Sequence, residues 1–426
     1  MEHKILNRYP LGNPHRVWRQ DNFVLSTFSA KGENMRDVLE NCAEAGFTML
    51  ELGWASHEQA EEALQICEEL NIDLLYQDFS VFGGMQGYHQ DRGPWDNAKA
   101  VVDHVRGYKS CVGYYIWDEP YRHEQLVEAR RVVDLFQKED PARCPFTVAI
   151  PSYNDIFTWQ NGQFGAYLYD YVNIIDPPML SLDYYPIGLP GYTDEKQLDD
   201  SLMWCDLGLM RQLCARHDLP LWFYYQAVNL HRYAHFEFPM VRMMMYAAVL
   251  YGAKALQQFT CVDSVIDEAG QKSIFFEETK AIHGEFRKLG NTLMALDSKH
   301  VFHSADLLPG SPYMTGLADD IVDSAWLAAP LPNRVSVGEL ADAYGNTYMV
   351  ILNRDFTTDK TITLPLKKTS RLYEVSRVTG RQSVLSDAAD QIEVTLAMGD
   401  AIVLRIQDAA EDAYTVEYRI DKDKKY

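Results

Sequence analysis

The run Cys111-Val-Gly-Tyr-Tyr-Ile-Trp-Asp-Glu-Pro-Tyr121 is the most informative stretch of this chain. Its apolar and aromatic residues predict a buried strand. Pro120 marks where the strand ends, because proline has no amide hydrogen to donate to a neighbouring strand. In parallel α/β folds, side chains at the carboxyl ends of strands leave the core and face a ligand. We therefore expect the adjacent carboxylates Asp118 and Glu119 at such an edge.

The segments on both sides of this strand alternate between short apolar runs and amphipathic helical patterns. Such alternation is typical of parallel strands joined by crossover helices. Strands are predicted at 23–28, 48–52, 72–76, 112–117, 146–150, 179–184, 219–224 and 253–259, with helices at 34–46, 57–70, 96–107, 122–137, 163–175, 200–217 and 238–251. Eight such units over roughly 240 residues have the size of a (β/α)8 barrel. A doubly wound sheet of eight strands is the alternative.

The pattern changes after a last predicted helix at 277–296, whose apolar face would seal the barrel. Beyond it, segments of alternating apolar and polar residues are separated by short turns, which is the pattern of antiparallel strands. These segments lie at 335–340, 347–352, 361–365, 392–396 and 401–406. The α/β chain is therefore predicted to form a catalytic TIM barrel over residues 1–298 and a small antiparallel β-sandwich domain over 299–410, followed by a charged tail at 411–426 that could add one strand.

The composition excludes several classes of partner. A formal net charge of −22 over 426 residues is unfavourable for binding nucleic acid or an anionic membrane, because both require a positive surface. The seven cysteines are scattered without ligand spacing, and we expect them to be reduced core thiols. The first residues carry no apolar signal region, so a cytoplasmic protein is expected, or a secreted one if a signal peptide was removed. The sequence leaves the oligomeric state open.

The residues that follow the predicted strands are mostly carboxylates, amides and aromatic rings. Carboxylates and amides can hydrogen-bond sugar hydroxyls, while Trp and Tyr rings stack on the apolar faces of sugars. The same positions offer no lysine for a Schiff base, no histidine pair at metal-ligand spacing and no glycine-rich phosphate loop. A carbohydrate substrate, bound without a cofactor or a metal, is therefore expected. The candidate residues are Glu51, Trp54, Gln77, Asp78, Trp117, Asp118, Glu119, Tyr153, Asp183, Tyr184, Tyr185, Trp222, Gln226 and Gln258.

Two motifs, Trp117-Asp-Glu-Pro120 and Asp183-Tyr-Tyr-Pro186, carry a resemblance to a known family. Together with a barrel and an appended β domain, they resemble clan A glycoside hydrolases. The similarity is greatest to β-galactosidase-like and uncharacterised bacterial glycosidases whose fourth strand ends in Asp-Glu-Pro. The resemblance implies that Glu119 is the general acid that protonates the glycosidic oxygen. It also implies that Tyr184 or Tyr185 supports a nucleophile.

The chain departs from this family at two positions. Asp118 stands where the family has an asparagine that holds a substrate hydroxyl. At the end of the seventh strand, where the family has its glutamate nucleophile, this chain has Gln226, and an amide cannot form the glycosyl-enzyme ester. The second carboxylate could come from Asp183, Glu51 or Asp263, in that order of preference. A wide spacing between the two carboxylates would give an inverting enzyme.

Three functions are compatible with these observations. We expect a glycoside hydrolase that cleaves an O-glycosidic bond of a neutral oligosaccharide. A barrel that binds sugar without hydrolysing it is the first alternative, and it rests on Gln226. The second is a metal-dependent sugar isomerase or epimerase, which the placement of the histidines disfavours. Each candidate residue also has a structural interpretation, since a buried carboxylate can be ion-paired and Trp117 or Trp222 can belong to the core.

Overall fold

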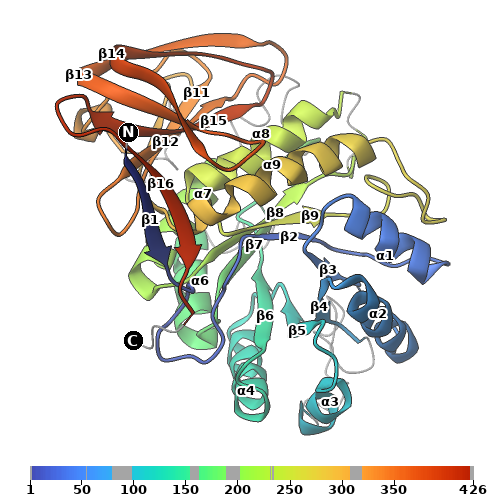
Figure 1. Ribbon diagram of the computed structural model, residues 1–426. Coiled ribbons are helices and arrows are strands. Elements are labelled where there is room, and N and C mark those ends of the chain that lie inside the picture. Colours follow the sequence, from blue (N-terminus) through green and yellow to red (C-terminus); the bar gives the residue numbers. More distant parts are fainter. Residues whose placement is uncertain are drawn as a thin grey trace.

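The computed structural model describes residues 2–53, 55–78, 98–153, 163–188, 202–230, 232, 235–307 and 319–422, so the predicted site residue Trp54 lies outside the described residues. Eight parallel strands close into a barrel, because β2 pairs with both β3 and β9 (Figure 1). The strands are β2 (Val24–Thr27), β3 (Met49–Glu51), β4 (Asp73–Tyr76), β5 (Cys111–Asp118), β6 (Cys144–Ala149), β7 (Leu180–Tyr184), β8 (Leu221–Gln226) and β9 (Ala255–Phe259). The predicted barrel is confirmed, and the doubly wound sheet, which would have two open edges, is excluded.

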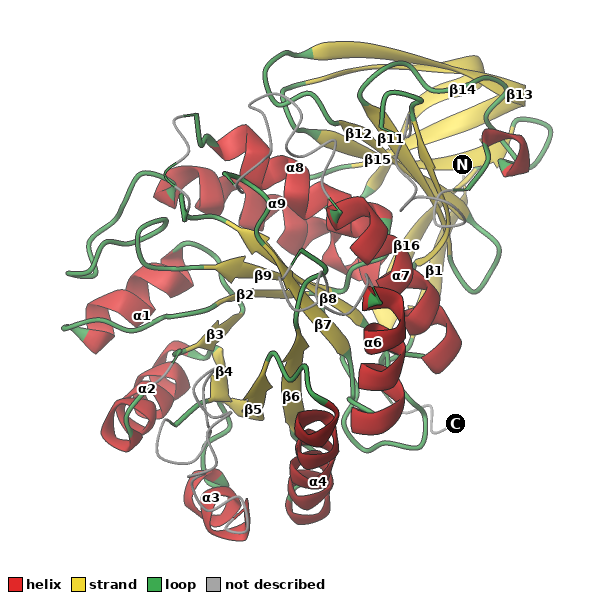
Figure 2. Ribbon diagram, turned by 180° about the vertical axis from the view of Figure 1, so that it is seen from behind, coloured by secondary structure: helices red, strands yellow, loops and turns green. Residues whose placement is uncertain are grey.

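Helices on the outside of the barrel join each strand to the next (Figure 2). In chain order they are α1 (Met35–Glu44), α2 (His57–Leu70), α3 (Ala98–Val105), α4 (His123–Glu139), α6 (Phe164–Asp170) with the π-helix η3 (Tyr171–Ile175), α7 (Met203–His217) and α8 (Phe238–Leu250), and α9 (Phe276–Met294) follows the last strand. Local sequence sets several ends: Asn34 caps α1, and Ser56 caps α2 in a capping box. Among the described helices, none combines the length and hydropathy needed to cross a lipid bilayer.

The residues after α9 form a separate six-stranded sheet with the order β10-β11-β12-β15-β13-β14. Its strands are β10 (Asp297–His303), β11 (Val335–Ala341), β12 (Thr347–Asn353), β13 (Lys360–Val375), β14 (Gln382–Leu396) and β15 (Ala401–Asp408), and neighbouring strands are antiparallel. A core of its own, which includes Phe302, Leu327 and Ile351, covers one face. The predicted antiparallel β domain is thus confirmed. Its strands β13 and β14 extend well beyond the predicted segments, because the two strands pair with each other along most of their length.

The two ends of the chain pair with each other. Strands β1 (Glu2–Arg8) and β16 (Tyr414–Ile420) form a parallel two-stranded sheet, drawn in blue and red in Figure 1. Strand β16 also contacts α9 and β14. The strand at 414–420 was expected from the sequence, whereas β1 was not, since most of its side chains are exposed and its alternation is weak.

The β domain packs closely on α8, which lies between it and the barrel strands (Figure 1). A Cβ atom added to Gly338 of β11 would lie 2.8 Å from the Leu250 carbonyl oxygen at the end of α8. A Cβ added to Gly399 would meet the Pro239 carbonyl oxygen at the start of the same helix. Glycine at these two positions therefore allows the sheet to approach the helix backbone directly.

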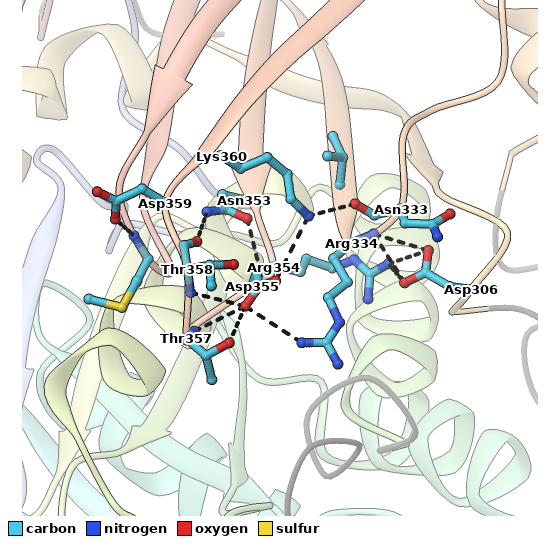
Figure 3. Close-up of polar contacts among 12 residues, drawn as sticks. Asp306, Asn333, Arg334, Asn353, Arg354, Asp355, Thr357, Thr358, Asp359 and Lys360 are labelled. Carbon is cyan, nitrogen blue, oxygen red and sulfur yellow. Dashed lines mark hydrogen bonds and ion pairs between the residues drawn. The ribbon is translucent and has the colours of Figure 1, made fainter.

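A buried arginine joins the β domain to α7. The side chain of Arg354 is fully buried, and its guanidinium lies 5.8 Å from the centre of the Trp204 ring. It donates a hydrogen bond of 2.7 Å to Ser304. It also lies 3.4 Å from Asp306, which accepts from the Arg334 amide (Figure 3). These polar partners belong to the β domain and compensate the buried charge, while the contact with the Trp204 ring links the arginine to the barrel.

Candidate active site

A shift in the pairing of β5 with β6 decides which side chains of β5 enter the barrel. Tyr115 faces the barrel interior, where its ring lies 4.9 Å from that of Phe146. Regular alternation of side chains would place Trp117 inside as well. The register shifts between Tyr115 and Trp117, so Trp117 packs in the outer core beneath the helices and Asp118 turns inward. There Asp118 accepts a hydrogen bond of 3.2 Å from the Tyr115 hydroxyl.

Glu119 leaves this strand in a backbone conformation that L-amino acids rarely adopt. Its φ is 48°, in the left-handed region, which costs roughly 1 kcal/mol. The Glu119 amide still donates to the Val148 carbonyl of β6 at 3.1 Å, and the Tyr167 hydroxyl donates to the Pro120 carbonyl at 3.0 Å. These contacts on both sides hold the strained residue in place, a feature that is common at functional sites.

Strand β7 brings a second carboxylate to Glu119. Asp183 is only 8% exposed, and the side chains of Glu119 and Tyr185 lie close enough to influence the pKa of its carboxyl group. The Tyr185 ring stacks on Phe259 at the end of β9, with ring centres 4.5 Å apart. Tyr153 follows β6, and the charges of Asp183 and Glu119 contribute to the raised pKa of its hydroxyl. The carboxyl-terminal mouth of the barrel thus unites two carboxyl groups with aromatic rings from the ends of β6, β7 and β9.

Burial raises the pKa of all three carboxyl groups at this mouth. Burial, the charge of Asp183 and the hydrogen bond to it raise the pKa of Glu119 to about 10. Burial and the charge of Glu119 raise the pKa of Asp118 to about 8. Burial and the charge of Asp118 raise the pKa of Asp183 to about 7. Interactions with the side chains of Glu119 and Tyr185 partly offset this rise. At pH 7 to 8, Glu119 therefore holds a proton, while the ionised fraction of Asp183 rises from about half at pH 7.

Glu51 lies deeper in the barrel and is fully hydrogen-bonded. Its Oε1 accepts from Ser26 Oγ at 2.8 Å and from Gln257 Nε2 at 3.1 Å, and the Tyr224 hydroxyl donates to Oε2. The residue is completely buried, and burial raises its pKa despite these three donors. The charge of Glu51 also contributes to the raised pKa of Asp118. In this structure the Glu51 carboxyl is thus bonded by three side chains of the barrel interior.

Gln226, at the end of β8, clamps the segment that follows β7. Its Oε1 accepts from the Ile187 amide at 2.8 Å, while its Nε2 donates to the carbonyls of Ile187 and Val228, both at 3.1 Å. The side chain is completely buried. Both polar atoms of the amide are therefore used by backbone groups of two neighbouring strand ends.

Three other predicted site residues contact the surrounding barrel. Gln77 accepts from the Gly53 amide at 2.8 Å, which links the ends of β3 and β4. Gln258 accepts from the Tyr225 hydroxyl at 3.0 Å. Tyr184 is buried in the outer core, and its ring meets the edge of the Tyr153 ring with centres 5.0 Å apart.

Trp222 lies at the other end of the barrel. Its indole nitrogen donates to Gln20 at 2.8 Å, and its ring lines a cavity of about 960 Å³ together with Asp73 and Cys111, the first residues of β4 and β5. Strand ends of this kind form the amino-terminal face of the barrel, opposite the carboxylates.

Asp78 points away from the barrel axis, toward the start of α2. Its Oδ2 lies 2.7 Å from His57 Nδ1. Of the described residues, His57, Glu61 and His104 form one group that could hold a metal ion.

Three residues that shape the mouth were not predicted from the sequence. The hydroxyls of Tyr115 and Tyr224 bond Asp118 and Glu51, but the strand pattern marks these tyrosines only as core residues. Asp206, in the first turn of α7, is 1% exposed and accepts from the Ser152 amide at 3.0 Å, and burial raises its pKa to about 8. Acidic residues are usual in a first helical turn, so its sequence position gave no signal.

Comparison with known proteins identifies the fold. No known protein-family profile matches this chain, and no curated protein sequence matches it. Gan42B, a GH42 β-galactosidase from G. stearothermophilus, aligns over 93% of this chain and 100% of its own, with a TM-score of 0.59 and 9% sequence identity. A cold-adapted β-galactosidase from Rahnella sp. R3 aligns over 94% of this chain and 100% of its own, with a TM-score of 0.54 and 11% identity. This chain therefore has the clan A-like fold of these glycoside hydrolases.

Proposed function

We propose that this chain is a glycoside hydrolase that cleaves an O-glycosidic bond of a neutral oligosaccharide. The observation that carries the proposal is the convergence of the Glu119 and Asp183 carboxyl groups at the carboxyl-terminal end of the barrel, where burial raises the pKa of both. Glycoside hydrolysis uses two carboxyl groups, one protonated and one ionised. The β-galactosidases that share the fold support a carbohydrate as the class of substrate.

In the proposed reaction, Glu119 donates its proton to the glycosidic oxygen as the bond from that oxygen to the anomeric carbon breaks. Its pKa of about 10 keeps the proton available at neutral pH. A glycosidic oxygen that enters beside Glu119 would accept a hydrogen bond from its protonated carboxyl group. Asp118 and the Tyr185 ring, both partly exposed at the mouth, would contact the sugar hydroxyls and the sugar face.

Asp183 is the second carboxylate in this proposal. With a pKa of about 7 it is ionised in about half of the molecules at neutral pH, and the fraction rises with pH. The charge of Asp183 acts on Glu119, so the two carboxyl groups are close, which fits the spacing of about 5 Å in retaining enzymes better than the roughly 6.5–9.5 Å of inverting enzymes. Asp183 would therefore attack the anomeric carbon and form a glycosyl ester, which water would then hydrolyse with Glu119 as the base.

One observation favours a second candidate, a barrel that binds carbohydrate without hydrolysing it. The resemblance to clan A glycosidases implies a nucleophile at the position of Gln226, and the Gln226 amide is bonded to backbone groups. In that case the carboxyl groups at the mouth would only bind sugar hydroxyls.

The test is a screen of aryl glycosides and of plant and microbial oligosaccharides with the wild-type chain and three variants, Glu119→Gln, Asp183→Asn and Glu124→Gln. Glu124 is exposed in the first turn of α4, so its replacement controls for the loss of one negative charge. We expect Glu119→Gln to lower kcat about 100-fold or more on poor leaving groups and far less on aryl groups that leave as stable anions. Asp183→Asn should abolish turnover of both, and the control should be unaffected.

NMR of the first-formed sugar then separates the mechanisms. A retained anomer supports Asp183 as the nucleophile, whereas an inverted anomer would assign it as the base that activates water. Full activity of Glu119→Gln on a substrate that needs leaving-group protonation would contradict the proposed acid. Sugar binding by calorimetry without turnover would favour the binding barrel.

A further inference from the structure

Three side chains with metal-ligating atoms meet in the helical layer outside the barrel. His57 and Glu61 belong to α2 and His104 belongs to α3, and one ligating atom from each lies within 4.8 Å of the others. The centres of the two imidazole rings are 4.7 Å apart. Because His57 and Glu61 are four positions apart in one helix, they share a helix face.

A buried carboxylate orients His57. Asp78 follows β4, is completely buried, and places its Oδ2 at 2.7 Å from His57 Nδ1 and at 2.9 Å from the Tyr76 hydroxyl, which donates to it. An imidazole that donates its Nδ1 hydrogen to a carboxylate keeps its Nε2 lone pair for another partner. Histidine ligands of zinc almost always have such a carboxylate, carbonyl or water partner on their second nitrogen. Asp78 thus gives this cluster an outer shell as well as three ligands.

We propose that His57, Glu61 and His104 bind one Zn²⁺ ion. Two imidazoles and one carboxylate are an established zinc ligand set, in which water takes the fourth tetrahedral position. Mg²⁺ and Ca²⁺ prefer sites made of oxygen ligands alone, so the two imidazoles select against them. The ion can enter from solvent, since the His57 side chain is 45% exposed and His104 is exposed.

The charges around the site also fit a cation. His57 is the first residue of α2, where the helix dipole places partial positive charge that opposes a cation by up to about 1 kcal/mol. The carboxylates of Glu61, in the cluster, and Asp78, beside His57, offset this unfavourable interaction with the helix dipole. The protein as a whole carries a formal charge of −22, which also attracts cations.

The ion would connect two helices and the end of a strand. The described part of α3 spans 8 residues, and a helix of this length depends on tertiary contacts for its stability. A zinc bridge would tie α3 to the first turn of α2 and, through Asp78, to the end of β4. The site involves neither Glu119 nor Asp183, so it stands or falls separately from the proposed hydrolysis.

The experiment uses the full chain, treated with EDTA, dialysed and titrated with Zn²⁺ alone in a calorimeter. We expect one equivalent of zinc for the wild type and an affinity at least 100-fold lower for His104→Ala. His123→Ala is the matched control, because His123 is an exposed histidine that begins α4 as His57 begins α2. It should bind zinc like the wild type. Asp78→Asn should weaken binding about 10- to 100-fold, the usual cost of losing an outer-shell partner.

Two further measurements keep the proposal testable if a variant folds poorly. Co²⁺ bound in place of Zn²⁺ should give the visible absorption of a tetrahedral site in the wild type and in His123→Ala, and none in His104→Ala. Glu119→Gln should retain stoichiometric zinc binding. Loss of binding in Glu119→Gln would place the ion at the barrel mouth and overturn the proposal. The absence of stoichiometric binding in the wild type, or unchanged binding in His104→Ala, would overturn it as well.

Discussion

At the scale of single residues, burial sets the charge state of the barrel mouth. Asp118, Glu119 and Asp183 converge where the barrel wall excludes water, and for each of them burial is the largest cause of the raised pKa. Neighbouring negative charges raise these pKa values further, since Glu51 acts on Asp118 and Asp183 acts on Glu119. The site therefore keeps a protonated carboxyl group at neutral pH, which is the state that a general acid requires.

These shifts predict that folding stability falls as pH rises above the range in which unfolded carboxyl groups titrate. In the unfolded chain the groups release their protons near pH 4, whereas the folded protein keeps them until about pH 7 for Asp183 and about pH 10 for Glu119. Between these values the folded state binds more protons, so the free energy of unfolding decreases by up to about 1.4 kcal/mol per pH unit for each proton.

Urea unfolding between pH 5 and pH 9 measures this slope. Glu119→Gln removes one titrating group and should flatten the curve, while the exposed Glu124→Gln should keep the wild-type slope. Parallel curves for the wild type and Glu119→Gln would show that the carboxyl of Glu119 is not protonated in the folded protein at neutral pH.

At the scale of elements, the ends of the strands decide which side chains face the mouth. The register shift in β5 exchanges the faces of Trp117 and Asp118, and the left-handed conformation of Glu119 then redirects the chain. At the end of β8, by contrast, the Gln226 amide is bonded to backbone groups of Ile187 and Val228 and so links two strand ends. Polar residues at the ends of two different barrel strands thus take different orientations.

We predict that Gln226→Glu destabilises the protein and adds no hydrolytic activity. A glutamate cannot donate to the carbonyls of Ile187 and Val228, and it would place a carboxylate in a fully buried site. The expected loss is roughly 2–4 kcal/mol in the free energy of unfolding, measured by urea denaturation. Gln212→Glu, on the exposed face of α7, is the matched control and should be neutral. A stable Gln226→Glu variant with increased turnover would mean that this position faces the substrate.

At the scale of the whole molecule, the β domain acts as a fixed extension of the barrel. Glycines bring the sheet against α8, buried Arg354 reaches the Trp204 ring, and the pairing of β1 with β16 joins the two ends of the chain. These contacts join segments far apart in sequence. We therefore expect the barrel and the β domain to unfold together in one transition.

The test at this scale is Gly338→Ala. The added methyl group would press on the Leu250 backbone at 2.8 Å, and the sheet or α8 must shift, at a cost of about 1–3 kcal/mol. Gly284→Ala is the control, because a Cβ there has no atom within 4 Å and alanine favours a helix, so about 0.5–1 kcal/mol of stabilisation is expected. Thermal unfolding of the wild type and of both variants measures these changes. A melting temperature of Gly338→Ala equal to that of the wild type would show that the interface tolerates a side chain at Gly338.

The architecture could be predicted because its signals are local. Strands and helices can be recognised from a few consecutive residues, by their periods of 2 and 3.6 residues. The same holds for the helix caps at Asn34 and Ser56. The site was predicted in part. Placing Glu119 and Asp183 after their strands brought them to one barrel mouth, since all carboxyl ends of a parallel barrel share one face. Whether neighbouring polar residues point into that mouth depends on side-chain partners that local patterns do not contain.

The sequence by itself determined the alternation of strands and helices, the appended antiparallel domain and the strand end that carries Asp118 and Glu119. Only the tertiary structure decided that Trp117 packs outward, that Gln226 serves the backbone, and that His57 meets His104 from another helix. The physical reason is the range of the interactions. Backbone periodicity and capping act over a few residues, whereas register shifts, hydrogen-bond partners and burial depend on segments that meet only when the barrel closes.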